Sequence, residues 1–320
     1  MSRILTIDEA ANWFKMNDDY LIITHRRPDG DAAGSAGALA QGLREFGKNA
    51  FVFENPEITP RYLPYIENYI APSDYSPANI VTVDTASHEM FPENIDAYKD
   101  SIVLCIDHHA SNSYYASLTC LEPNRAACGE LIYEILISLS GSISQETSKG
   151  LYTAIVSDTG CFSYSNTTAQ TLRIASELFE FGAPHTELNK LLFRTKTQSR
   201  IKIEGMISAG LEFHFGGIVA ISTITGKMKE DSGATEDDLD DIASIPSSIE
   251  GVLCGITLSE LTSPLDCKAS VRTVADINAA DICAYFGGGG HLMAAGFSLD
   301  KPISEVKASL LEMLPKHLSI

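Results

Sequence analysis

The chain has 320 residues, 44% of them hydrophobic, and its 42 acidic and 23 basic side chains give a formal net charge of −19. That length predicts two domains, and the acidity argues against a protein that wraps long nucleic acid, because such proteins neutralise many phosphates with Lys and Arg. No run approaches the roughly 20 apolar residues of a membrane span and no secretory signal starts the chain, so a cytoplasmic protein without a membrane partner is expected.

From Tyr20 to Asp107 the sequence alternates short apolar runs with polar turns and helix-like stretches. The apolar runs predict strands at 20–24, 51–53, 80–83 and 102–106. Helical periodicity predicts helices at 34–46, 130–139, 146–157 and 168–181. Strands that are apolar on both faces and separated by helical crossovers indicate a parallel sheet with helices on both faces. Residues 1–188 are therefore predicted to form an α/β domain.

A change in composition marks the second half of the chain. Five bases and no acid occur between Lys190 and Lys202, which predicts a solvated linker helix over 189–205 rather than a nucleic-acid patch. The acidic stretch 229–241 is predicted to be a solvated loop or a frayed helix. The remaining pattern indicates an antiparallel sheet and two helices, which together form a smaller α+β domain over 206–320. Its strands are expected near 211–215, 218–224, 252–258 and 267–274, and its helices near 278–285 and 304–314.

Acidic and imidazole side chains follow the predicted strands at the points where they end. They are His25, Asp29 and Asp31 after the first strand, Asp84 after the third, and Asp107, His108 and His109 after the fourth, with Asp158 closing a later helix. In an open parallel sheet, ligands bind outside the carboxyl ends of the strands. Taken alone, each Asp is more often a helix N-cap, and each His more often a surface or core residue, than a ligand. Together, however, so many carboxylates would repel one another unless cations lay between them. Carboxylates and imidazoles without thiolates suit Mn²⁺ or Mg²⁺, with Zn²⁺ or Co²⁺ as alternatives.

At these residues the sequence resembles the DHH phosphoesterase superfamily. The segment His-x-x-Pro-Asp-x-Asp, an isolated strand-end Asp, the Asp-His-His triplet and a later Asp occur here in the family's order. The run Phe286-Gly287-Gly288-Gly289-Gly290-His291, followed by Ala294-Ala295-Gly296, is similar to the signature of the DHHA1 domain. The compact pairing of these two domains most resembles the NrnA-type oligoribonucleases, or nanoRNases. Some of these enzymes also dephosphorylate 3′-phosphoadenosine 5′-phosphate.

The resemblance implies an α/β DHH domain that holds two divalent metal ions, with Mn²⁺ expected and Mg²⁺ or Co²⁺ as alternatives. His25, Asp29 and Asp84 would hold the first ion. The second ion would be held by Asp31, Asp84, His108 and Asp158, so that Asp84 bridges the two. Such a pair of ions lowers the pKa of a shared water and stabilises both the entering and the leaving oxygen of a phosphodiester.

The resemblance also implies roles in catalysis and substrate binding. Asp84 would act through both ions, Asp107 would orient an imidazole, and His109 would face the substrate phosphate. In the DHHA1 domain, Arg272 matches the family's phosphate-binding arginine. The glycine run would let backbone N–H groups approach an anion closely, with His291 beside it. The substrate-binding residues of this run are Gly288, Gly289, Gly290 and His291.

The resemblance implies hydrolysis of very short oligonucleotides, of roughly two to five nucleotides, to mononucleotides. The charge agrees with a short substrate, because an acidic body with one small cationic cleft repels a long polyanion. Turnover of 3′-phosphoadenosine 5′-phosphate to AMP is a second expected activity. A phosphodiesterase dedicated to linear or cyclic dinucleotides (pGpG, pApA or c-di-AMP) is an alternative. A non-catalytic RNA-binding module is the alternative from another class, and the complete set of ligand residues argues against it. Assembly as a homodimer is left open.

Overall fold

The computed structural model describes residues 2–239, 241–274, 277–290 and 292–318. Contacts within the chain divide it into two compact units, an N-terminal unit (Met1–Thr195) and a C-terminal unit (Lys196–Ile320). The stretch 189–205, for which one linker helix is predicted, contains two helical segments. A short helix α6 (His185–Asn189) continues into a π-helical turn (Lys190–Arg194), and α7 (Gln198–Ala209) begins after a break at 195–197. Thr197 caps α7, since its hydroxyl accepts a hydrogen bond from the backbone N–H of Arg200.

The N-terminal unit is built on a six-stranded parallel sheet with the strand order β1-β6-β5-β4-β2-β3, which confirms the predicted α/β class. The four predicted strands are present, but β1 at the edge of the sheet and its neighbour β6 were not expected. β1 has only two residues and β6 only four, so neither carries a clear hydrophobic pattern. The strands are β1 (Arg3–Ile4), β2 (Tyr20–Ile23), β3 (Ala50–Val52), β4 (Asn79–Val83), β5 (Ile102–Asp107) and β6 (Leu118–Leu121).

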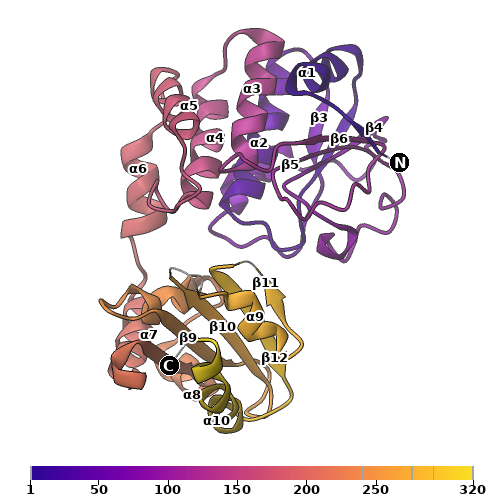
Figure 1. Ribbon diagram of the computed structural model, residues 1–320. Helices are drawn as coiled ribbons and strands as arrows, with labels where there is room; N and C mark the ends of the chain where they lie inside the picture. Colours follow the sequence, from indigo (N-terminus) through magenta and orange to yellow (C-terminus); the bar gives the residue numbers. More distant parts are fainter. Residues whose placement is uncertain (1, 240, 275–276, 291, 319–320) are drawn as a thin grey trace. The chain divides into compact units, whose positions relative to one another are not determined.

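Helices cover one face of this sheet (Figure 1). They bury Ile22, Val81 and Leu104 in the larger hydrophobic core. Helices α2 and α4 approach so closely that a Cβ added at Gly34 would lie 2.4 Å from the carbonyl oxygen of Gly150. This contact brings the first turn of α2 and the last turn of α4 to the same edge of the sheet. The helices are α1 (Ile7–Met16), α2 (Gly30–Glu45), α3 (Cys128–Ser140), α4 (Gln145–Asp158) and α5 (Ala169–Glu180).

The opposite face of the sheet differs from the prediction of a second helical layer. Leu21, Ile23 and Cys105 on this face are covered by apolar side chains such as Phe91 and Ile95, which come from the connection between β4 and β5. That connection contains a 3-10 turn (His88–Met90) and no α-helix. Pro92 follows directly after Phe91 and lacks the N–H that a helix interior needs, which disfavours a helix that runs through this position.

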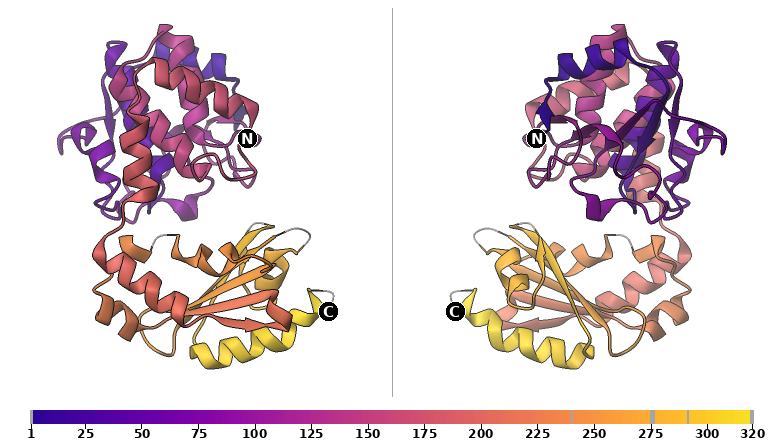
Figure 2. Two further views of the ribbon diagram at one scale, coloured as in Figure 1. Left: turned by 90° about the vertical axis from the view of Figure 1, so that its left-hand side faces the viewer. Right: turned by 90° about the vertical axis from the view of Figure 1, so that its right-hand side faces the viewer.

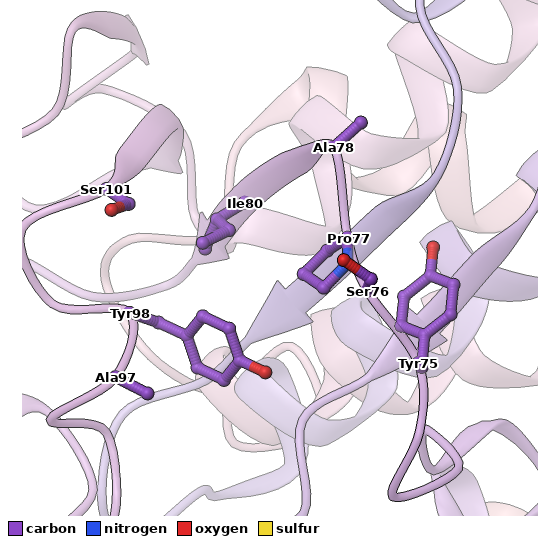
Figure 3. Close-up of a pocket in the computed structure, with 8 residues that line it drawn as sticks. All are labelled: Tyr75, Ser76, Pro77, Ala78, Ile80, Ala97, Tyr98 and Ser101. Atoms are coloured by element: carbon purple, nitrogen blue, oxygen red, sulfur yellow. The ribbon is translucent and has the colours of Figure 1, made fainter.

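The carboxyl ends and the amino ends of the parallel strands carry different features. β3 and β4 lie on opposite sides of β2, so the carboxyl ends of β2 and β4 flank the point where the strand order reverses. A shallow pocket lies at the other end, where β4 and β5 begin, between Tyr75 and Pro77 on one side and Tyr98 on the other (Figure 3). The polar residues of the sequence motifs therefore lie at the opposite end from this pocket.

The C-terminal unit contains a second six-stranded sheet with the order β11-β12-β10-β9-β8-β7. The prediction of an antiparallel sheet is wrong at one pair, because β8 and β9 are parallel. The long connection between them crosses back over the sheet, which is what a parallel pair requires. The strands of this second sheet are β7 (Glu212–His214), β8 (Val219–Ile224), β9 (Cys254–Glu260), β10 (Cys267–Thr273), β11 (Gly289–Gly290) and β12 (Ala294–Leu299).

Two helices, α9 (Ala279–Ala284) and α10 (Ile303–Met313), pack on one face of this sheet, and α7 packs on the other (Figure 2). Within the acidic stretch 229–241, residues 229–239 are more ordered than predicted. They include the end of α8 (Gly226–Ser232) and a 3-10 turn in which Asp238 is buried and accepts a hydrogen bond from the Thr197 hydroxyl. In the described part of the chain, no helix combines the length and apolarity needed to cross a membrane.

Candidate metal centre

Five elements deliver the predicted metal ligands to one edge of the N-terminal sheet. His25 follows β2, Asp84 follows β4, and His108 follows β5, so neighbouring parallel strands place them side by side. Helix α2 adds Asp29 at its N-cap and Asp31 in its first turn, and helix α4 adds its last residue, Asp158. The structure thus brings together all six predicted metal ligands.

The first group of side chains consists of His25, Asp29 and Asp84. The Nε2 atom of His25 lies 3.8 Å from Asp84 Oδ2 and 3.9 Å from Asp29 Oδ1. These distances are too long for hydrogen bonds, and the three ligand atoms lie within 4.8 Å of one another, which is close enough to share a cation. Asp29 is fixed as the N-cap of α2, because its Oδ1 accepts hydrogen bonds from the backbone N–H groups of Asp31 and Ala32, both at 3.0 Å.

The second group is centred on His108. Its Nε2 atom lies 3.3 Å from Asp158 Oδ2, 3.5 Å from Asp84 Oδ1 and 3.7 Å from Asp31 Oδ2. Asp84 therefore takes part in both groups, with Oδ2 toward His25 and Oδ1 toward His108. It also adopts a left-handed backbone conformation (φ 54°), which is uncommon for a residue other than glycine. Its N–H is held by the carbonyl oxygen of Ile106 at 3.0 Å, and strain of this kind is concentrated at functional sites.

Two buried polar atoms at the centre of the site have no hydrogen-bond partner among the described residues, namely Asp84 Oδ1 and His108 Nε2. Leaving a buried polar atom unsatisfied costs about 1–3 kcal/mol. The other ring nitrogen of His108, Nδ1, lies 3.1 Å from the carbonyl oxygen of Arg125, which can only accept a hydrogen bond. In the neutral ring Nδ1 therefore carries the proton, which leaves Nε2, on the side of the carboxylates, as the nitrogen that can bind a metal ion. A divalent cation would satisfy both atoms, so these residues fit the implied metal ions.

The electrostatics of the cluster lead to the same conclusion. Burial and the charges of Asp84 and Asp158 raise the pKa of Asp31 well above its ordinary value. Burial and the charges of Asp29 and Asp84 raise the pKa of Asp158 to about 7. Burial lowers the pKa of His108, but the neighbouring carboxylates of Asp84, Asp31 and Asp158 outweigh it and raise that pKa to about 11. Without a cation, the cluster must hold protons to limit carboxylate repulsion, and a bound divalent ion would replace those protons.

In the Asp-His-His triplet, His108 lies among the predicted metal ligands, whereas Asp107 and His109 contact each other. Asp107 Oδ1 lies 2.8 Å from Nδ1 of His109, and its Oδ2 accepts a hydrogen bond of 2.6 Å from the side-chain amide of Asn112. The hydrogen bond to Asp107 is the main reason why the pKa of His109 is raised. Burial raises the pKa of Asp107, but the hydrogen bond from His109 and the His109 charge outweigh it, so that pKa is lowered. Asp107 therefore orients the ring of His109, whose side chain is 29% exposed.

Several supporting contacts were not predicted from the sequence. The buried carboxylate of Asp31 accepts hydrogen bonds from the backbone N–H groups of Cys128 (2.6 Å) and Gly129 (3.0 Å) and from the Ser35 hydroxyl (3.0 Å). Cys128 and Gly129 form the first turn of α3, where the N–H groups and the helix dipole favour a negative charge. Nearly 100 residues separate these partners from Asp31, so no local pattern in the sequence indicates them.

The predicted substrate-binding residues lie in the C-terminal unit. Arg272 is half-buried on β10 and donates a hydrogen bond to the carbonyl oxygen of Val271. Gly288 has a packing role, because an added Cβ would lie 2.3 Å from the Gly296 carbonyl oxygen. Gly290 has a φ of 145°, whereas Gly289 has open space around its Cα. His291 lies outside the described residues. The substrate roles of these residues stay predictions.

Comparison with known proteins covers most of the chain. The model of the DHH family N-terminal domain matches residues 19–157, and the model of the DHHA1 domain matches residues 216–319. The bifunctional oligoribonuclease and PAP phosphatase NrnA of Thermus thermophilus is 33% identical over 281 residues, which is 87% of this chain and 83% of that protein. The Bacillus subtilis protein of the same name is 27% identical over 91% of this chain and 92% of its own length. An exopolyphosphatase-related protein of Bacteroides fragilis has the same fold, with a TM-score of 0.88, 24% identity, and coverage of 98% of this chain and 97% of that one.

Proposed function

Because the chain belongs to the DHH family and carries a DHHA1 domain, we propose that it is a two-metal phosphoesterase that hydrolyses very short oligonucleotides to mononucleotides. The observation that carries the proposal is the position of Asp84 between two groups of ligand atoms, with Oδ2 3.8 Å from His25 Nε2 and Oδ1 3.5 Å from His108 Nε2. Among the described residues, neither Asp84 Oδ1 nor His108 Nε2 has a hydrogen-bond partner. His25, Asp29 and Asp84 would hold one divalent ion, for which we propose Mn²⁺. Asp31, Asp84, His108 and Asp158 would hold the other.

Two ions bound in this way would supply an activated water and Lewis acidity toward the phosphoryl oxygens. Residues of the chain would orient the metal ligands and the proton donor. The carbonyl of Arg125 keeps His108 in the tautomer that leaves Nε2 free. Asp107 holds Nδ1 of His109, which leaves Nε2 of that ring for the substrate. Because Asp107 raises the pKa of His109, the ring retains its proton more readily and can donate it to a phosphoryl or leaving oxygen.

Short oligonucleotides are favoured as substrates by the charge of the protein and by its relatives. The net charge of −19 would repel a long polyanion, whereas a few cationic groups suffice for a substrate with few phosphates. Arg272 and the glycine turn around β11 would bind phosphate in the C-terminal unit. The relatives from Thermus thermophilus and Bacillus subtilis are named for both oligoribonuclease and PAP phosphatase activity. We therefore include 3′-phosphoadenosine 5′-phosphate as a second substrate and keep linear or cyclic dinucleotides as the alternative specificity.

A substrate panel tests the proposal. The purified protein with MnCl₂ would be given RNA dimers and pentamers, a long RNA, pGpG, pApA, c-di-AMP, 3′-phosphoadenosine 5′-phosphate and pyrophosphate, and release of mononucleotides or phosphate would be measured. We expect the RNA dimers and pentamers to have the highest kcat/KM and EDTA to abolish turnover. Faster cleavage of the long RNA than of the dimers would contradict the proposal, and so would activity that is confined to pyrophosphate. A strong preference for c-di-AMP or pApA over RNA dimers would favour the alternative specificity.

A further inference from the structure

The connection between β6 and α3, together with the first two residues of α3, contacts two of the proposed ligands of one metal ion. Within this segment, residues 125–129, the carbonyl oxygen of Arg125 lies 3.1 Å from His108 Nδ1. The backbone N–H groups of Cys128 and Gly129 donate to the carboxylate of Asp31. The segment thus presents a carbonyl acceptor and two N–H donors to ligands that come from two other elements, β5 and α2.

Asn166 links the same segment to the third ligand. Its side-chain amide nitrogen donates one hydrogen bond to the carbonyl oxygen of Ala126 (3.1 Å) and another to the carbonyl oxygen of Asp158 (3.0 Å). Asp158 is the last residue of α4, so its carbonyl has no partner within the helix. One amide group therefore ties the end of α4, from which the Asp158 carboxylate projects, to the 125–129 segment.

Ion pairs and hydrogen bonds hold the segment itself in place. The Arg125 guanidinium lies 2.8 Å from Glu134 Oε2 and 3.7 Å from Glu130 Oε2, both on α3. Glu130 is fully buried, and its Oε1 accepts a hydrogen bond of 2.6 Å from the Thr171 hydroxyl on α5. A buried charge that loses its partner is strongly destabilising, so this network fixes the position of Arg125 relative to α3 and α5.

We propose that the 125–129 segment, fastened by Asn166, is a positioning element for one of the two metal ions, the one held by Asp31, His108 and Asp158. This inference rests on the proposed dinuclear site. The first group of ligands depends on other contacts, because Asp29 is fixed as the N-cap of α2 and the carbonyl of His25 accepts a hydrogen bond from Asn55. Loosening the segment should therefore weaken the binding of one ion and spare the other.

Asn166→Asp provides the main test, because it preserves the size of the side chain but replaces the donating nitrogen with an acceptor oxygen facing two carbonyl oxygens. Asn166→Ala is the second variant, since it removes the link without adding a charge. Asn166 is exposed, so neither change should prevent folding. Asn17→Asp is the matched control. Asn17 also donates from its side chain to a backbone carbonyl, that of Trp13 at 2.8 Å, but it lies at the end of α1.

The measurement is calorimetric titration of the EDTA-treated full chain with MnCl₂, together with its thermal unfolding without metal. We expect two bound ions in the wild type and in Asn17→Asp. In both Asn166 variants, the ion held by His25, Asp29 and Asp84 should bind with unchanged affinity. The affinity for the other ion should fall by about tenfold or more, which is the usual effect of removing a group that orients a metal ligand. The midpoint of unfolding of the metal-free Asn166 variants should match that of the control variant.

Two results would overturn the inference while leaving the dinuclear site intact. One is unchanged affinity for both ions in the Asn166 variants, and the other is equal weakening of both ions, which would indicate a general structural effect. Fewer than two bound ions in the wild type would instead overturn the dinuclear site and with it this inference. That outcome is recognised from the wild type alone, so the two failures are distinguishable.

Discussion

The clustered carboxylates predict that the metal-free protein loses stability as the pH rises, and that divalent metal restores it. Burial and the neighbouring charges of Asp29 and Asp84 raise the pKa of Asp158 from 3.8 to about 7. Between these values the folded state holds a proton that the unfolded state has released, so the free energy of unfolding falls with pH. The slope for one proton is about 1.4 kcal/mol per pH unit, and the shift corresponds to about 4 kcal/mol across the window.

Titration of His108 also lowers the free energy of unfolding as the pH rises, but over a higher pH range. The pKa of His108 is raised from 6.5 to about 11, so its contribution to stability is complete below pH 6.5 and is lost as the pH rises toward 11. Asp29 and Asp107 have lowered pKa values, and their contributions are lost only as the pH falls below 3.8. The window from pH 5 to 8 therefore reports the raised pKa values without interference from these two groups.

The assay is thermal unfolding of the EDTA-treated protein from pH 5 to 8, with and without MnCl₂. A change of 1 kcal/mol shifts the midpoint by roughly 2–4 °C for a unit of this size, so the metal-free midpoint should fall by several degrees across the window. The stabilisation by Mn²⁺ should increase with pH, because the ion displaces protons that become easier to remove. Asp158→Asn should show a shallower slope below pH 7. A metal-free midpoint that stays constant or rises from pH 5 to 8 would refute the reasoning.

Three further predictions concern turnover. Asp84→Asn should reduce Mn²⁺-dependent kcat by at least about a thousandfold, because one oxygen of the shared carboxylate becomes an amide nitrogen; substantial remaining activity in a steady-state assay would contradict a shared ligand. His109→Ala should lower kcat by about 10²–10⁴-fold with a small change in KM, and Asp107→Asn should lower it less, which a comparison of the two variants would show. Arg272→Ala should raise KM by about 10–100-fold, the value of a charge-assisted hydrogen bond of 1.5–3 kcal/mol. It would lower kcat as well if the contact tightens in the transition state, and unchanged kinetics would remove Arg272 from the site.

Local signals were sufficient for most of the N-terminal strands and for the identity of the polar residues at their ends. The uninterrupted apolar run 102–106 identifies a buried strand from the sequence alone. Asp107, His108 and His109 follow this run directly. Such signals failed for β6, which has four residues, and for the parallel pairing of β8 with β9, which depends on how a long connection crosses the sheet. They also failed for the second face of the sheet, where a 3-10 turn and loops take the place of helices.

The sequence by itself determined which residues are candidates, because their types and their positions after apolar strands are local properties of the chain. The tertiary structure decided how the candidates are held. The close approach of α2 and α4 brings Asp158 within 3.3 Å of His108, and the Arg125 carbonyl determines which nitrogen of that ring is free. Asn166 then ties the end of α4 to the segment that holds Asp31. These partners lie far apart along the chain, and only the packing of helices on the sheet brings their atoms within hydrogen-bonding distance.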